Sequence, residues 1–178
     1  YLGVREMRKH VAWYTTGLPN SAKLRGEINA VESYEELEKL LEEKKIHTIW
    51  FEMHYMYRNR LEEFAKRFAP ARVKFRCGIE SFDGVRRREW NKGVPADVTV
   101  ADVAKYFSGV CLLVCTQGDT KERIITDIEL AKNNFEYMSV NLFCNNETEV
   151  RRDEELADWF VKEVYPKIKD DNRVEVLI

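Results

Sequence analysis

The stretch "GVCLLVCTQGDTKERIITDIELAKNNFEYMSVNLFC", residues 109–144, decides the fold. It opens with "GVCLLVCT" and closes with "YMSVNLFC", two short apolar runs that are typical of buried strands. Between them, "TKERIITDIELAKNNF" has apolar residues three and four positions apart, which predicts an amphipathic helix. A strand, a helix and a second strand in this order predict a right-handed crossover between parallel strands.

The same alternation extends in both directions, from residue 46 to the end of the sequence. Further strands are predicted in "IHTIWFEMH", "RVKFRCGIE" and "RVEVLI", and further helices in "RNRLEEFAKRFA", around "DVAKYF" and in "RDEELADWFVKEVYPKI". This order predicts an α/β fold with a parallel sheet, which is either the open half of a (βα) barrel or a doubly wound sheet. Because the chain begins without Met and ends within a strand-like run, we expect a fragment of a longer protein.

The first 44 residues have a helical pattern throughout. Apolar residues recur at helical spacing over residues 4–14, and in "SYEELEKLLEE" Ser33 and Glu36 have the spacing of a capping box. The composition changes near residues 43–46 without a Gly/Ser linker. We therefore predict two tightly joined domains, a three-helix segment over residues 1–44 and the α/β part over residues 45–178.

Composition excludes several classes of protein. The chain has 178 residues, 44% hydrophobic residues and 29 Lys and Arg against 31 Asp and Glu, which is typical of a globular protein with a core. No apolar run approaches the roughly 18 to 20 residues that span a bilayer, so we expect a cytoplasmic protein without membrane contact.

The four cysteines, Cys77, Cys111, Cys115 and Cys144, are predicted to be reduced and mostly buried thiols. They lie in or beside apolar runs and show no C-x-x-C spacing. Cys111 and Cys115 fall on one predicted strand, where four residues span about 13 Å, so one ion cannot be held by both. No metal site is predicted.

Polar residues stand where the predicted strands end, which is the active edge of parallel α/β folds. Each strand must leave the core for water, and that requirement alone explains part of this pattern. It does not explain Glu52 and Glu80, which lie inside apolar runs and are expected to be buried with partners. The polar residues expected at the barrel mouth are Glu52, His54 and Asn145.

The turn "TQGDTKERIITDI" between a predicted strand and helix is a candidate binding loop. It places Gly118 and a capping residue, Asp119 or Thr120, before the helix, so that backbone N–H groups can receive an anion or a polar ligand edge. Most strand-to-helix turns in α/β proteins look similar.

The first 31 residues combine cations with interleaved aromatic side chains, which fits either an RNA-binding surface or an amphipathic helix on a core. The elements "RKHVAWY", "GLP" followed by Ala22, and the closing "SYEELEKLL" resemble the C-terminal helical domain of bacterial tRNA-dihydrouridine synthases, over residues 1–43. In that family the helical domain follows an FMN-binding barrel and helps to grip tRNA. The resemblance implies tRNA as a partner, with tRNA-facing side chains at Arg8, Lys9, His10 and Arg25.

Residues 46–178 resemble instead the C-terminal half of a radical S-adenosylmethionine (radical SAM) protein. The segments that carry this resemblance are "FEMHYMYRNRLEEFAKRF", "KFRCGIESFDGVRRREWNKGV", "CLLVCTQGDTKERIITDIELA" and "VNLFCNNETEVRRDEELADWFVKEVYP". It implies a partial (βα) barrel of the radical SAM type. The implied cofactor-binding residues are Glu80 and Ser81, beside the SAM ribose or methionine, and Gln117, Gly118 and Thr120, near the adenine. Cys115 stands where a glycine is common in that family.

The C-x-x-x-C-x-x-C loop that binds the [4Fe–4S] cluster of radical SAM proteins does not occur in this sequence. The flavin barrel and catalytic cysteine of the synthase are also missing, so we assign no catalytic residue and expect no cofactor to be bound by this chain alone. We predict a fragment or fusion that is related to tRNA modification and inactive by itself. One alternative is a radical SAM enzyme whose cluster loop lies in missing sequence. The other is an RNA-binding module on an α/β scaffold. Independently of these alternatives, the open sheet edge is expected to favour a homodimer.

Overall fold

The structure is a computed structural model that describes residues 21–44, 48–69 and 71–178. The described residues fall into two compact units, one within residues 1–51 and 62–73 and the other comprising residues 52–61 and 74–178. The predicted domain boundary at residue 44 stays a prediction. No helix in the described ranges combines the length and the apolar character that crossing a bilayer requires.

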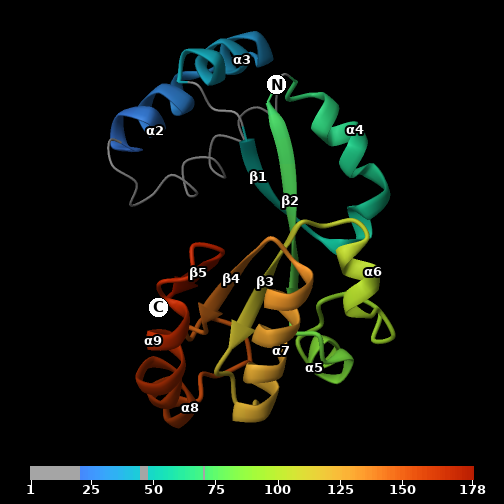
Figure 1. The fold of residues 1–178 in the computed structure, drawn as a ribbon, viewed down its shortest axis with the longest axis vertical. Coiled ribbons are helices and arrows are strands. Elements are labelled where there is room, and N and C mark those ends of the chain that lie inside the picture. The colour runs from blue at the N-terminus through green and yellow to red at the C-terminus, as the bar shows by residue number, and fades with distance from the viewer. Residues whose placement is uncertain (1–20, 45–47, 70) are drawn as a thin grey trace. The chain divides into compact units, whose positions relative to one another are not determined.

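Five strands form one sheet whose spatial order follows the sequence (Figure 1). The strands are β1 (Thr48–Met53), β2 (Arg72–Glu80), β3 (Gly109–Val114), β4 (Tyr137–Leu142) and β5 (Val174–Leu177). The pairs β2–β3, β3–β4 and β4–β5 are parallel. Doubly wound sheets reverse their strand order at a switch point. The unreversed order of this sheet is therefore that of a half-barrel, the first of the two predicted arrangements.

Each predicted strand forms within its apolar run, and the helices follow the predicted segments with two differences. The helical elements are α2 (Ser21–Ala30), α3 (Tyr34–Glu43), η1 (Tyr55–Arg60), α4 (Leu61–Lys66), α5 (Gly84–Glu89), α6 (Val100–Ala104), α7 (Lys121–Asn134), α8 (Glu154–Trp159), η2 (Phe160–Val164) and α9 (Tyr165–Ile168). Helix α5 was not predicted. The single helix expected over residues 152–168 is interrupted by the π-helical turn η2.

Side-chain caps fix the starts of several helices, among them α3 and α7. The Ser33 hydroxyl accepts a hydrogen bond from the Glu36 backbone N–H at 3.1 Å, as predicted. The Glu36 carboxylate accepts from the backbone N–H of Glu32 at 2.7 Å rather than from that of Ser33, so the capping box is displaced by one residue. Thr120 caps α7 by accepting from the Arg123 backbone N–H at 3.2 Å.

The two faces of the sheet differ in polarity. On one face, Val110 of β3, Met138 of β4 and Val174 of β5 are paired in register and buried. Helix α7 lies along β3 and β4 and covers this face (Figure 1). On the other face, which we call the inner face, the next residues in register are Cys111, Ser139 and Glu175. Because successive side chains in a strand alternate, the polar residues of the sheet gather on the inner face.

Candidate functional site at the carboxyl ends of the strands

Glu80 ends β2 with its backbone in the left-handed region, at φ +66°. Its side chain is 12% exposed and pairs with Lys92, whose Nζ donates to Oε1 at 2.6 Å. Burial raises the pKa of the Glu80 carboxyl, and the Lys92 ammonium opposes that rise. The predicted burial of Glu80 with a partner is therefore correct, and the partner is a lysine twelve residues later.

His54 stands at the end of β1, where it was predicted, but both of its ring nitrogens bind backbone groups. Nδ1 accepts from the Met56 backbone N–H at 3.2 Å, which caps η1. Nδ1 must therefore carry the lone pair, and Nε2 donates its proton to the Lys92 carbonyl oxygen at 2.6 Å. His54 and Glu80 thus hold the Lys92 loop from two sides.

Ser81 is 1% exposed and belongs to a buried hydrogen-bond network. Its hydroxyl donates to Asp127 Oδ2 at 2.6 Å, and Asp127 Oδ1 accepts from the Phe82 backbone N–H at 3.1 Å. Burial raises the pKa of Asp127 to about 6, against the lowering effect of these two hydrogen bonds. The network fixes the turn that follows Glu80. In this structure Ser81 therefore positions that turn through its bond to Asp127.

The loop between β3 and α7 packs against a buried arginine. Arg86 Nη2 donates to Thr116 Oγ1 at 2.6 Å and to the Gln117 carbonyl oxygen at 2.8 Å. Gly118 has φ +77°, and a Cβ there would lie 3.0 Å from Arg86 Nη1, so two features of this position require glycine. Gln117 and Gly118 are exposed, whereas the Thr120 hydroxyl serves as the helix cap.

Glu52 is not the buried carboxylate that its place in an apolar run suggested, because its side chain is 40% exposed. It lies on the inner face, beside Cys111 and Arg76. Cys111 Sγ donates to Glu52 Oε2 at 3.0 Å, and Arg76 Nε lies 3.5 Å from the same oxygen. The alternation of side chains in β1, rather than the mean polarity of its run, determines where Glu52 points.

Arg76 connects two glutamates across the inner face. Its side chain is 8% exposed, and Nη1 lies 3.2 Å from Glu175 Oε2. The Tyr137 hydroxyl donates to the same oxygen at 2.9 Å. Glu52, Arg76 and Glu175 therefore form a continuous charged row over β1, β2 and β5.

The cysteines do not fit an iron–sulfur cluster. Burial raises the pKa of the Cys77 and Cys115 thiols to about 12, and that of Cys111 also lies well above its usual value, so these three are protonated at neutral pH. Cys77 shares its face with Val110 and so lies opposite Cys111. Cys144 is exposed and, like Cys115, follows its strand instead of lying within it as predicted. Within the described ranges, no three His, Cys, Asp or Glu residues are arranged to hold a metal ion.

The remaining predicted site residues are placed less centrally or lie outside the described part. Asn145 is exposed, and its Oδ1 accepts from the Arg152 backbone N–H at 2.8 Å. Arg8, Lys9 and His10 lie outside the described residues, and the side chain of Arg25 is likewise not described. The proposed tRNA-facing set therefore stays a prediction.

Three residues that hold the site were missed by sequence reasoning: Lys92, Arg86 and Asp127. Asp127 had a signal, since it occupies a position on the apolar stripe of α7 beside Ile124 and Ile128. A carboxylate in such a stripe needs a buried partner. Lys92 and Arg86 lie among other charged residues, and nothing in the sequence distinguishes them from solvated ones.

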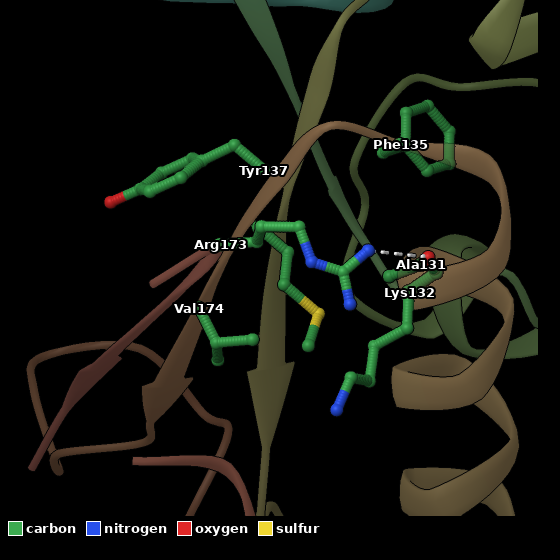
Figure 2. A pocket seen from close by; sticks show the side chains of 7 residues that line it. Ala131, Lys132, Phe135, Tyr137, Arg173 and Val174 are labelled. Atoms are coloured by element: carbon green, nitrogen blue, oxygen red, sulfur yellow. Dashed lines mark hydrogen bonds between the residues drawn. The ribbon is translucent and has the colours of Figure 1, made fainter. Parts of the chain in front are cut away.

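A small surface depression lies at the opposite, amino end of β4 and β5 (Figure 2). Met138, Val174 and Phe135 contribute its apolar wall. Its two cations, Lys132 and Arg173, are both paired with Asp171, at 3.2 and 3.1 Å. Figure 2 also shows Arg173 bonded to the Lys132 carbonyl oxygen. Among the described residues, both cations of the depression are therefore held by Asp171.

No protein-family model matches the chain. Among solved structures, it is similar to a queuine lyase from Clostridium spiroforme bound to SAM and queuine, with a TM-score of 0.71 and 34% sequence identity. The match covers 80% of this chain and 61% of that chain, so the protein spans about three fifths of the length of the lyase. The fold is a partial barrel of the radical SAM type. The resemblance of residues 1–43 to dihydrouridine synthases receives no support from this comparison and stays a prediction.

Proposed function

We propose that this chain is the SAM-binding part of a radical SAM barrel that acts on queuine or a closely related 7-deazaguanine base. The observation that carries the proposal is the 34% identity to a queuine lyase structure that holds both SAM and queuine. The chain spans only part of that enzyme, so the activity requires more than the residues present in this sequence.

The residues at the carboxyl ends of β2 and β3 fit the polar groups of SAM. Glu80 offers a carboxylate to the ribose hydroxyls or the methionine amine, and the contact it makes among the described residues is that of Oε1 with Lys92. Gln117 and Gly118 present an exposed loop to the adenine. Ser81 acts through its bond to Asp127, which keeps the β2–α5 turn in place.

The donor set for the [4Fe–4S] cluster does not fit, because the buried thiols are protonated and Cys77 lies on the opposite face from Cys111. In radical SAM enzymes the cluster supplies the electron for SAM cleavage. We therefore assign the cluster to cysteines that this sequence does not contain, and assign SAM and base binding to the inner face described above.

Equilibrium binding of SAM to the purified chain tests the proposal. We expect saturable binding that Glu80→Gln weakens about tenfold, the effect of losing one charge-assisted hydrogen bond. Glu129→Gln, at an exposed position of α7, is the matched control and should bind as the wild type does. A chain that folds and binds no SAM would refute the assignment.

We also propose that residues 1–43 bind tRNA, on the strength of the basic and aromatic pattern around Arg8, Lys9 and His10. Filter binding across a salt series tests this, because phosphate contacts weaken steeply with salt. Replacing Arg8 and Lys9 together by Ala should lower tRNA affinity and reduce the salt slope by about two. Affinity that is independent of salt would contradict a phosphate-contacting helix.

A further inference from the structure

One row of residues crosses the inner face with small side chains in its middle and a carboxylate at each end. Its central members are Cys111 and Ser139, which are paired in register, and its last member is Glu175. At the other end the Glu52 carboxylate reaches over Gly78 to Cys111, since a Cβ on Gly78 would lie 3.1 Å from Glu52 Oε1.

Each terminal carboxylate of the row has spare hydrogen-bonding capacity. Oε2 of Glu52 and Oε2 of Glu175 take all the contacts described for the two groups, including those from Arg76. The two side chains are 40% and 42% exposed, so each can accept further hydrogen bonds. With Arg76 between them, the three charges sum to −1, which favours a cationic ligand.

Two uncharged groups on β4 point to a ligand in the same place. Ser139 is fully buried, and the Cys111 thiol is the one partner of its hydroxyl among the described residues. Asn141, the next inward residue toward the carboxyl end of β4, has a buried amide oxygen without a hydrogen-bond partner in the described part of the chain. Buried polar atoms without partners are costly. Together with the carboxylates of Glu52 and Glu175, the Ser139 hydroxyl and the Asn141 amide oxygen form a group of mostly hydrogen-bond acceptors.

We propose that this row recognises the donor groups of a 7-deazaguanine base with a protonated amine on its exocyclic arm. The inference rests on the proposed function and assigns its base-binding residues. A guanine-type edge carries N1–H and 2-amino donors, which a carboxylate can accept in pairs. The amine, positive at neutral pH, requires a second anionic partner.

The surroundings of the two carboxylates determine which group each one takes. Glu52 lies near a second carboxylate, Glu80, since a Cβ on Gly78 would also lie 3.9 Å from Glu80 Oε1, and Lys92 offsets part of the charge of Glu80. Glu52 therefore binds the ammonium. Glu175, whose Oε2 is held by Tyr137 and Arg76, accepts from the base edge through Oε1. The Arg76 guanidinium lies between the two carboxylates and contacts both, at 3.5 Å from Glu52 and 3.2 Å from Glu175. The distance between the carboxylates is therefore set by this one side chain.

Binding of three bases to the purified chain tests the assignment: queuine, the cationic 7-aminomethyl-7-deazaguanine and the neutral 7-cyano-7-deazaguanine. We expect Glu52→Gln to weaken binding of the two cationic bases at least tenfold and that of the neutral base less than twofold. Glu175→Gln should weaken all three at least tenfold. Glu129→Gln should change none, and SAM affinity should stay within twofold in every variant.

The possible failures are distinguishable. If the wild type binds SAM and the bases but Glu52→Gln affects cationic and neutral bases alike, the row does not bind the ammonium, and the inference fails while the proposed function stands. If the wild type binds SAM but no deazaguanine, both the inference and the substrate part of the proposed function fail. Urea unfolding of each variant identifies a general loss of structure, which would lower SAM affinity as well.

Discussion

At the scale of single residues, Cys115 occupies a backbone position that suits glycine. Its φ is +66° and its side chain is fully buried. The left-handed conformation costs a residue with a Cβ about 1 kcal/mol or more, whereas in ordinary strands glycine is the less stable choice by roughly 0.5 to 1 kcal/mol. We expect Cys115→Gly to be more stable than Cys115→Ala by about 1 kcal/mol in urea unfolding.

Cys77 provides the matched control, because it is equally buried but lies within β2. In β2 the backbone is that of an ordinary strand, so we expect Cys77→Ala to be more stable than Cys77→Gly. Comparing alanine with glycine at each site cancels the loss of the thiol. The same order at both positions would show that the backbone at Cys115 is not strained.

Asp127 should make stability depend on pH in a defined direction. Its pKa of about 6 in the folded protein, raised by burial, exceeds the usual value of 3.8. The folded state therefore binds more protons between these values, and its contribution to stability falls as pH rises from about 4 to 6, by at most about 1.4 kcal/mol per pH unit. The loss is complete about one pH unit above the folded-state pKa.

Urea unfolding of wild type and Asp127→Asn between pH 4 and 7 measures this contribution as a difference, which removes the other titrating groups. The wild type should lose stability relative to the variant as the pH rises. Glu129→Gln, an exposed change on the same helix, should show the same pH dependence of the unfolding free energy as the wild type. If the unfolding free energies of Asp127→Asn and of the wild type change with pH in the same way, the Asp127 carboxyl of the wild type titrates normally.

At the scale of elements, the strands were predictable and the elements that hold the site were not. Apolar runs bounded by polar residues define β2 and β3 because burial on both faces needs nearly continuous apolar side chains. Helix α5 is short and basic, and its formation depends on tertiary contacts such as those of Arg86 and Arg87. The pairing of Glu80 with Lys92 likewise depends on how the chain returns to the end of β2.

Arg87 is the residue through which α5 holds the loop that follows it. It is fully buried and donates to the carbonyl oxygens of Ser81, Pro95, Ala96 and Val98, at 2.9 to 3.1 Å. Arg87→Met would leave these carbonyls without their donor, so we expect a loss of about 3 kcal/mol or more in unfolding free energy. Arg88→Met, at the exposed neighbouring position, should change it by no more than about 0.5 kcal/mol. Equal effects of the two variants would show that Arg87 does not hold the loop.

At the scale of the whole molecule, the distribution of thiols separates SAM binding from cluster binding. Three of the four cysteines are buried with raised pKa values, and the fourth, Cys144, is exposed. Cluster ligands must be thiolates, and three must converge. We therefore expect anaerobic reconstitution with iron and sulfide to leave far less than one cluster per chain, by iron analysis and visible absorbance.

The control for reconstitution is a radical SAM enzyme that contains the three-cysteine loop, treated in parallel. Cys144→Ser reports on adventitious iron, because the exposed thiol is the one cysteine that metal can reach without unfolding, and the variant should lose whatever little iron the wild type retains. A stoichiometric cluster that survives in Cys144→Ser would require the buried thiols to rearrange. The assignment of the cluster to cysteines outside this sequence would then be wrong, whereas the SAM and base sites on the inner face would still be judged by their own binding tests.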